Sequence, residues 1–190
     1  MDDKQEIRIL DACCGSRMFW WDKTEPHTTF MDIRQENRDI TNGSVTKHVT
    51  VNPDIIADFR HMPFPDNHFD LVVFDPPHLI WAGPKSFMKA QYGQLPADWR
   101  SYMKDGFDEC LRVLKNTGIL LFKWSQAQIH LADVLAVLGR TPILGDKHAS
   151  TRWEVFLKHP NPLPLEDTGF LQGTLLEETS TQSHVNTSVR

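Results

Sequence analysis

Short apolar runs recur along the chain, and four of them lead into an aspartate. Runs of this length without strict alternation are typical of strands buried in a parallel sheet, whose carboxyl ends meet at one edge. The aspartates are Asp11, Asp32, Asp58 and Asp75. Strands are therefore predicted at 7–10, 28–31, 54–57, 69–74, 118–122 and 153–157, the last with alternating polarity.

Two amphipathic stretches are predicted to be helices. Apolar residues recur at spacings of three and four over 98–114 and over 126–138, and Gly139 follows the second stretch as a stop signal. This alternation predicts an α/β fold: a doubly wound, mostly parallel, Rossmann-like sheet of about seven strands with the last strand antiparallel. Proline-rich and then Thr-, Ser- and Glu-rich sequence divides the chain into a domain at 1–159 and a flexible tail at 160–190.

Composition narrows the function classes. The chain has 190 residues and a formal charge of -5, so it is not expected to bind polyanions through its overall charge. No apolar run is long enough to span a membrane. Its 3 cysteines lack disulfide-framework and zinc-ligand spacing, and no metal site is expected. The charged first residues do not form a signal peptide. We therefore expect a cytoplasmic protein in which any nucleic-acid site is a local patch.

The acids at the strand ends suggest a nucleoside ligand. A turn of small residues at 11–16 lets the backbone approach a ligand, and Gly15 can adopt positive φ. Asp32 is suited to accept hydrogen bonds from a ribose diol, and Asp58 from an exocyclic amine. Neither the dinucleotide fingerprint nor the phosphate-binding loop is present, which favours a ligand with a ribose and no phosphate. The alternative is that these acids only cap loops.

Three runs, at 10–16, 58–70 and 112–118, together resemble over residues 7–158 the class I S-adenosylmethionine-dependent methyltransferases. The run Leu-Asp-Ala-Cys-Cys-Gly-Ser at 10–16 is similar to the first motif of the amino-group methyltransferases, and 58–70 is similar to their passage from third to fourth strand. Residues 112–118 resemble the turn before their fifth strand. Arg17 is a departure, because it stands where the motif often has its last glycine.

The resemblance implies S-adenosylmethionine as the cofactor. Asp11 and Gly15 would line its methionine moiety, Asp32 would hold the ribose hydroxyls and Asp58 the adenine amine. The side chains of Cys13 and Cys14 are interpreted as small fillers of a crowded turn rather than as nucleophiles or ligands. The cofactor-binding residues expected on this basis are Asp11, Cys13, Gly15, Asp32, Asp58 and Phe59.

The tetrapeptide Asp75-Pro76-Pro77-His78 is the predicted catalytic motif, because it resembles the motif of methyltransferases that modify an exocyclic or amide nitrogen. Such a nitrogen is a poor nucleophile because its lone pair is delocalised. The Asp75 carboxylate and the Pro76 carbonyl would accept its hydrogen bonds, and the two prolines would hold that carbonyl rigidly. His78 would stack on the planar substrate. The alternative is a chain-breaking Pro-Pro turn that His78 caps.

The long connection at 79–104 interleaves aromatic and cationic residues. It is interpreted either as a lid that stacks bases and follows a nucleic-acid backbone, or as a helical insertion packed on the sheet. Trp81, Lys85 and Tyr92 are its candidate substrate residues. Lys123, at the end of the fifth strand, is a further candidate, which would contact a phosphate or a substrate carbonyl. The alternatives are that it caps Asp75 or faces solvent.

The sequence thus favours an N-methyltransferase that acts on a nucleobase amine, adenine N6 first, in DNA or RNA. Because little of the chain is left for target recognition, a partner is expected to supply specificity; the oligomeric state is open. The alternatives are a methyltransferase acting on a protein glutamine amide or a small-molecule amine, and a catalytically inactive module that binds S-adenosylmethionine.

Overall fold

A seven-stranded sheet forms the centre of the computed structural model, which describes residues 6–158. The strand order is β5-β2-β1-β6-β7-β9-β8, and β9 runs antiparallel to both its neighbours while the pairs among the first five strands are parallel. The predicted fold class is confirmed; the predicted tail lies outside the described residues. The strands are β1 Ile9–Asp11, β2 Thr28–Asp32, β5 Ile55–Ile56, β6 Phe69–Phe74, β7 Leu114–Ser125, β8 Leu144–Gly145 and β9 Thr151–Leu157.

Three helices occur in the described part of the chain: α1 (Phe87–Tyr92), α2 (Trp99–Val113) and α3 (Leu131–Leu138). The buried stripe of α2, which includes Met103 and Phe107, confirms the helix predicted from the apolar spacing. Helix α3 begins five residues later than predicted, because the Gln126 side chain accepts a bond from Leu131 N at 3.1 Å and 126–130 forms a loop. None of these helices is long and apolar enough to cross a membrane.

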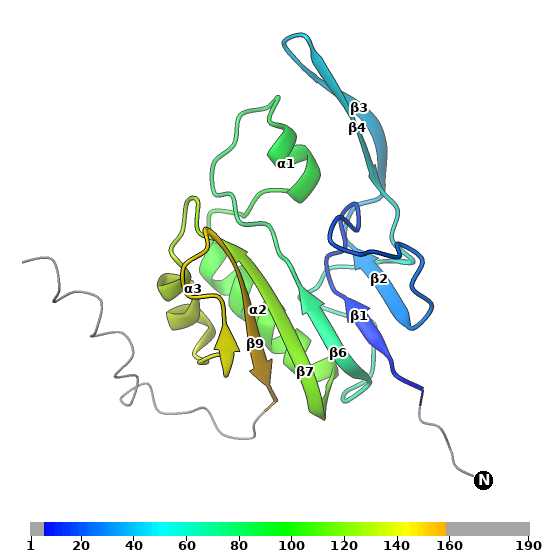
Figure 1. The fold of residues 1–190 in the computed structure, drawn as a ribbon, viewed down its shortest axis with the longest axis vertical. Helices are drawn as coiled ribbons and strands as arrows, with labels where there is room; N and C mark the ends of the chain where they lie inside the picture. The colour runs from blue at the N-terminus through cyan, green and yellow to red at the C-terminus, as the bar shows by residue number, and fades with distance from the viewer. Residues whose placement is uncertain (1–5, 159–190) are drawn as a thin grey trace, which may run out of the picture.

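Helices α2 and α3 lie on one face of the sheet (Figure 1). Along β7 the residues on that face, such as Leu120 and Phe122, are fully buried, whereas Ile119 on the other face is 43% exposed. In the described residues, helices therefore cover one face of the sheet, whereas parallel sheets usually have helices on both faces. Between β1 and β2 there is a loop instead of a helix, and its Phe19 and Trp20 rings cover part of the second face by packing on β9 and β2.

Helix α2 packs on the sheet so closely that it has no room for a side chain at Gly106. A Cβ there would lie 2.4 Å from the Phe59 ring and 3.2 Å from Phe74. We expect Gly106→Ala to lower stability by about 1–2 kcal/mol, because overpacking outweighs the gain in helix propensity of about 1 kcal/mol. Thermal unfolding measures this change. Gly83→Ala is the control, since nothing lies within 4 Å of its Cβ; an equal loss in both variants would contradict the packing argument.

A hairpin that the sequence reasoning missed follows β2. Strands β3 (Glu36–Asn42) and β4 (Val45–Val51) pair antiparallel around the two-residue turn Gly43-Ser44, with Gly43 at φ 63. Gly-Ser between two β-prone runs is a hairpin signal that was available in the sequence. The hairpin projects beyond the sheet edge next to α1 (Figure 1). It shares with α1 a second small core, which consists of Ile40, Val49, Val51, Ala90 and the partly buried Phe87.

Candidate active site

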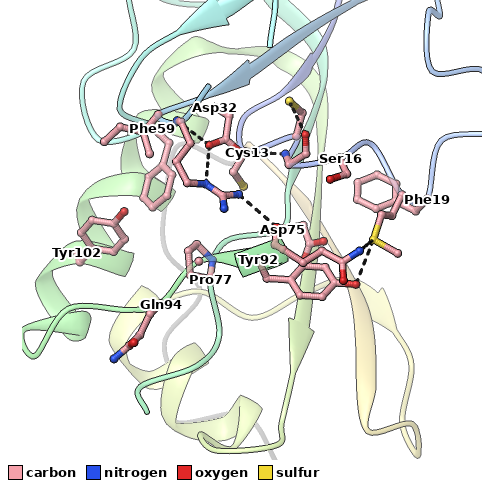
Figure 2. A pocket seen from close by; sticks show the side chains of 17 residues that line it. Cys13, Ser16, Phe19, Asp32, Phe59, Asp75, Pro77, Tyr92, Gln94 and Tyr102 are labelled. Carbon is pink, nitrogen blue, oxygen red and sulfur yellow. Dashed lines mark hydrogen bonds and ion pairs between the residues drawn. The ribbon is translucent and has the colours of Figure 1, made fainter. Parts of the chain in front are cut away.

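A cavity of about 170 Å³ lies at the carboxyl ends of β1, β2 and β6. This is the edge at which ligands bind in sheets of this type. Figure 2 shows Asp32, Asp75 and Tyr92, from three different elements, around the same space. Of the residues predicted from sequence, the cavity wall contains Cys13, Gly15, Asp32, Phe59, Asp75, Pro77 and Tyr92.

The turn after β1 brings its backbone to the cavity. Gly15 has φ 50, the left-handed conformation that glycine favours, and its N–H donates to Asp32 Oδ2 at 2.9 Å. Arg17, in the place of the motif's last glycine, also has a left-handed φ of 52. Its guanidinium lies 3.7 Å from the Phe30 ring centroid and 3.0 Å from Asp54, contacts that offset the backbone strain.

Asp32 lines the cavity but is already engaged. Besides Gly15 N–H, it accepts bonds from Arg34 N at 2.9 Å and Arg34 Nε at 3.2 Å. The same guanidinium donates to the carbonyls of Ala90 and Gln91 in α1, at 3.1 and 3.3 Å. Arg34 therefore connects the end of β2 to the helix that roofs the cavity; the sequence reasoning did not identify it.

The residues after β5 divide between the cavity and an ion pair. Phe59 lines the cavity, with its ring edge-on to Phe74 and Tyr102 at 5.1 and 4.9 Å. Asp58 is not in the cavity wall; it pairs with Arg60 at 2.7 Å. The hydrogen bond from Arg60 keeps the pKa of Asp58 below its ordinary value. The expected contact of Asp58 with a ligand amine stays a prediction.

Asp11 is fully buried next to the cavity rather than in its wall. Its Oδ2 accepts from Trp20 Nε1 at 2.7 Å, and Oδ1 from Cys13 N–H at 3.4 Å. Burial raises the pKa of Asp11 to about 7. Its contacts are those of a carboxyl group that holds the first turn against the Trp20 loop, so its expected contact with the methionine moiety stays a prediction.

Cys13 and Cys14 both line the cavity as thiols. Burial, with Asp11 adding to it, raises the pKa of Cys14 to about 12 and that of Cys13 well above its ordinary value. A thiol of this kind is a weak nucleophile. The interpretation of both side chains as fillers of the turn agrees with this environment. Among the described residues there is also no group of three or more His, Cys, Asp or Glu side chains that could hold a metal ion.

The carboxylate of Asp75 lies in the cavity wall directly after β6. Lys123 Nζ donates to its Oδ2 at 2.7 Å, so of the roles considered for Lys123 the structure has the one that caps Asp75. Burial raises the pKa of Asp75, and the Lys123 charge opposes the rise. Pro77 lines the cavity with Asp75, whereas Pro76 is buried behind it.

His78 is buried and absent from the cavity wall. Its ring lies against Tyr92 and Trp124, at centroid distances of 5.7 and 6.4 Å, and its Nε2 has no hydrogen-bond partner among residues 6–158. Burial lowers its pKa, so the ring is neutral at pH 7. Stacking of His78 on a substrate does not fit this position. Tyr92, which comes from α1, does line the cavity with its ring.

Hydrogen bonds hold the backbone after the Pro-Pro motif, although the Ile80 and Trp81 side chains are exposed. Gln128 Oε1 accepts from Ile80 N–H and Trp81 N–H at 2.8 and 2.9 Å, and Gln128 Nε2 donates to Trp81 O at 2.8 Å. The Trp81 side chain is 75% exposed. Lys85 lies farther along, beside a shallow groove between 83–88 and Asn42 of the hairpin. Neither Trp81 nor Lys85 lines the cavity.

Comparisons with known proteins were made for the chain and its fold. No protein-family model matches the sequence, and no curated protein matches it significantly. Among solved structures, the PH0226 protein of Pyrococcus horikoshii aligns over 80% of this chain and 83% of its own, with a TM-score of 0.52 and 14% identity.

Two further solved structures are described as S-adenosylmethionine-dependent methyltransferases. A TehB-like protein of Corynebacterium glutamicum aligns over 81% of both chains, with a TM-score of 0.45 and 16% identity. A protein of Leishmania major aligns over 78% of this chain and 63% of its own, with a TM-score of 0.45 and 12% identity. At such identities, structural similarity is evidence for the fold alone. The similarity to the PH0226 protein agrees with the α/β fold described above.

Proposed function

We propose that the chain is an S-adenosylmethionine-dependent N-methyltransferase whose acceptor is the exocyclic amine of a nucleobase, adenine N6 in first place. The observation that carries the proposal is the position of Asp75. Its carboxylate lines the same cavity as Gly15 and Asp32, and Lys123 occupies one of its two oxygens. A free carboxylate oxygen next to a nucleoside-type cavity is what transfer to a weakly nucleophilic amine requires.

The residues around the cavity fit the cofactor. Carboxylate oxygens of Asp32 can accept from ribose hydroxyls, and the Phe59 and Tyr102 rings offer apolar walls for a base. When bound, S-adenosylmethionine supplies an electrophilic methyl group on a sulfonium. The cavity is smaller than the roughly 300–1,000 Å³ of most small-molecule sites. Binding therefore requires part of the cavity wall to move outward.

Asp75 would act on the acceptor by hydrogen bonding. An amine N–H donates to its free oxygen and a second N–H to the Pro76 carbonyl, which favours the tetrahedral nitrogen. S-adenosylmethionine, held at Gly15 and Asp32, would supply the methyl group to the nitrogen lone pair, and the proton that the methylated nitrogen loses would pass to Asp75 and then to solvent. Fixed acceptors of this kind contribute alignment and electrostatic stabilisation without reorganisation during the reaction.

Trp81 supports a nucleobase as the acceptor. It is three residues beyond Pro-His, its backbone is fixed by Gln128, and its side chain is 75% exposed. An exposed aromatic ring on a backbone held by hydrogen bonds can stack on a base of single-stranded or extruded nucleic acid. A glutamine amide of a protein or a small amine would not need such a platform.

We expect Trp81→Ala to raise the KM for a nucleic-acid acceptor about 10- to 100-fold with a smaller change in kcat, because stacking contributes about 1–3 kcal/mol per base. Steady-state kinetics on single-stranded oligonucleotides measure this effect. Trp21→Ala is the matched control, since Trp21 is fully exposed and does not line the active-site cavity. Equal effects of the two substitutions, or none, would argue against the stacking role.

The proposed function is tested by transfer of labelled methyl groups from S-adenosylmethionine to separate DNA, RNA and protein fractions, followed by nucleoside and peptide analysis. We expect N6-methyladenosine or its deoxy form in a nucleic-acid fraction. Label on glutamine or on small amines would replace the acceptor class, and cofactor binding without transfer to any fraction would support an inactive binding module.

A further inference from the structure

Lys123 and Asp75 form an enclosed ion pair at the carboxyl ends of two adjacent strands. Phe74 of β6 and Phe122 of β7 are register partners, so Asp75, directly after β6, and Lys123 of β7 lie side by side. The pair is 2.7 Å long, and the side chains are only 10% and 19% exposed. A pair this well shielded is screened far less by salt than a surface ion pair.

Aromatic rings from three elements surround the Lys123 ammonium. The ring centroids of Phe19, Trp153 and Tyr92 lie 5.2, 5.6 and 5.9 Å from its Nζ. Phe19 belongs to the loop after β1, Trp153 to β9 and Tyr92 to α1. Ring faces attract a cation without competing for its hydrogen bonds, so the rings fix the ammonium where it reaches Asp75.

The other titratable groups close to Asp75 cannot replace this cation. Asp11 in β1 and Cys13 in the turn after it interact electrostatically with Asp75. A carboxyl group and a thiol are either neutral or negative, so neither can supply a positive charge. His78 is buried and neutral at pH 7, and Tyr92 contributes an uncharged ring. Without Lys123, the buried carboxylate of Asp75 would therefore take up a proton more readily.

We propose that Lys123 is a positioning residue, which keeps Asp75 ionised and ties up its Oδ2 so that Oδ1 is free for the acceptor amine. This inference rests on the proposed function. The negative charge of Asp75 offsets the positive charge of Lys123. The ammonium therefore repels the positive charge that develops on the methylated nitrogen less than an unpaired lysine would. It acts through Asp75 and does not itself touch the reacting atoms.

The test compares Lys123→Met, which removes the charge, with Lys123→Arg, which retains it. In protein without cofactor or acceptor, NMR titration of the ¹³C-labelled Asp75 carboxyl should give a midpoint about 1–3 pH units higher in Lys123→Met, and near wild type in Lys123→Arg. The acid limb of the kcat profile should move to higher pH by the same amount, because only ionised Asp75 accepts the N–H. The KM for the acceptor should change little.

Lys115→Met is the matched control, since Lys115 pairs with Asp70 at 2.8 Å between the same two strands at their opposite ends. It should leave the Asp75 titration in place. An unchanged Asp75 midpoint in Lys123→Met, or a raised acceptor KM with an unchanged pH profile, would overturn the proposal; the latter would indicate a phosphate contact. If Lys123→Met does not fold, a wild-type Asp75 that titrates above about pH 7 overturns it. A shifted midpoint in a protein that methylates no acceptor would refute the proposed function alone.

Discussion

Asp75→Ala is expected to reduce methyl transfer by roughly 10²–10³-fold or more, with cofactor affinity nearly unchanged. The substitution removes the charged acceptor that favours the tetrahedral amine, while Asp32 and the turn at Gly15 remain in place. Single-turnover transfer under saturating cofactor measures the loss, and calorimetric titration with the demethylated cofactor product measures binding.

Asp70→Ala provides a control that alters the same strand. Asp70 also pairs with a lysine of β7, but at the amino end of β6, far along the sheet from the cavity. This variant should retain transfer even where its stability falls. Turnover of Asp75→Ala at the rate of Asp70→Ala would remove Asp75 from the mechanism.

Asp32→Ala is expected to have the opposite pattern and to weaken cofactor binding at least 10-fold, because hydrogen bonds to a charged group contribute about 1.5–3 kcal/mol each. Isothermal titration with S-adenosylmethionine measures the loss. Asp32→Asn separates loss of the Gly15 hydrogen bond from loss of the ribose contact, because the amide keeps an oxygen that can accept from Gly15 N–H. If this variant is as stable as wild type and still binds the cofactor weakly, the lost contact is the one to the ribose.

Asp39→Ala is the control for this second substitution. Asp39 lies on the hairpin, where it is exposed and pairs with His48 at 2.7 Å. Its removal should leave cofactor affinity at the wild-type value. Equal weakening by both substitutions, or none by Asp32→Ala, would exclude Asp32 from the cofactor site.

The central strands and the position of the site follow directly from local pattern. Apolar runs that end in aspartate predicted where β1, β2 and β6 stop, and parallel pairing then brings Asp32 and Asp75 to one cavity. Helix α2 was predictable because its apolar stripe is long and regular. These features depend on residues close in sequence and on a topology with few alternatives.

The parts that the sequence did not reveal depend on contacts between distant segments. Arg34 links Asp32 to the carbonyls of α1 across 56 residues, and no spacing in the chain indicates this. The rings around Lys123 likewise come from three separate elements. The burial of His78 results from Tyr92 packing over it. The hairpin is a different case, since Gly43-Ser44 gave a local signal.

The two lysine–aspartate pairs between β6 and β7 have a consequence for strand alignment. One pair lies at each end of the shared ladder, and an irregularity in the pairing occurs between Phe69 and Leu71, beside the Asp70 pair. A slip of β7 by one residue would separate both pairs, turn Phe122 away from the α2 side and leave two lysines without counter-ions. The slipped alignment that would displace Asp75 is thus also disfavoured by the charges that it leaves unpaired.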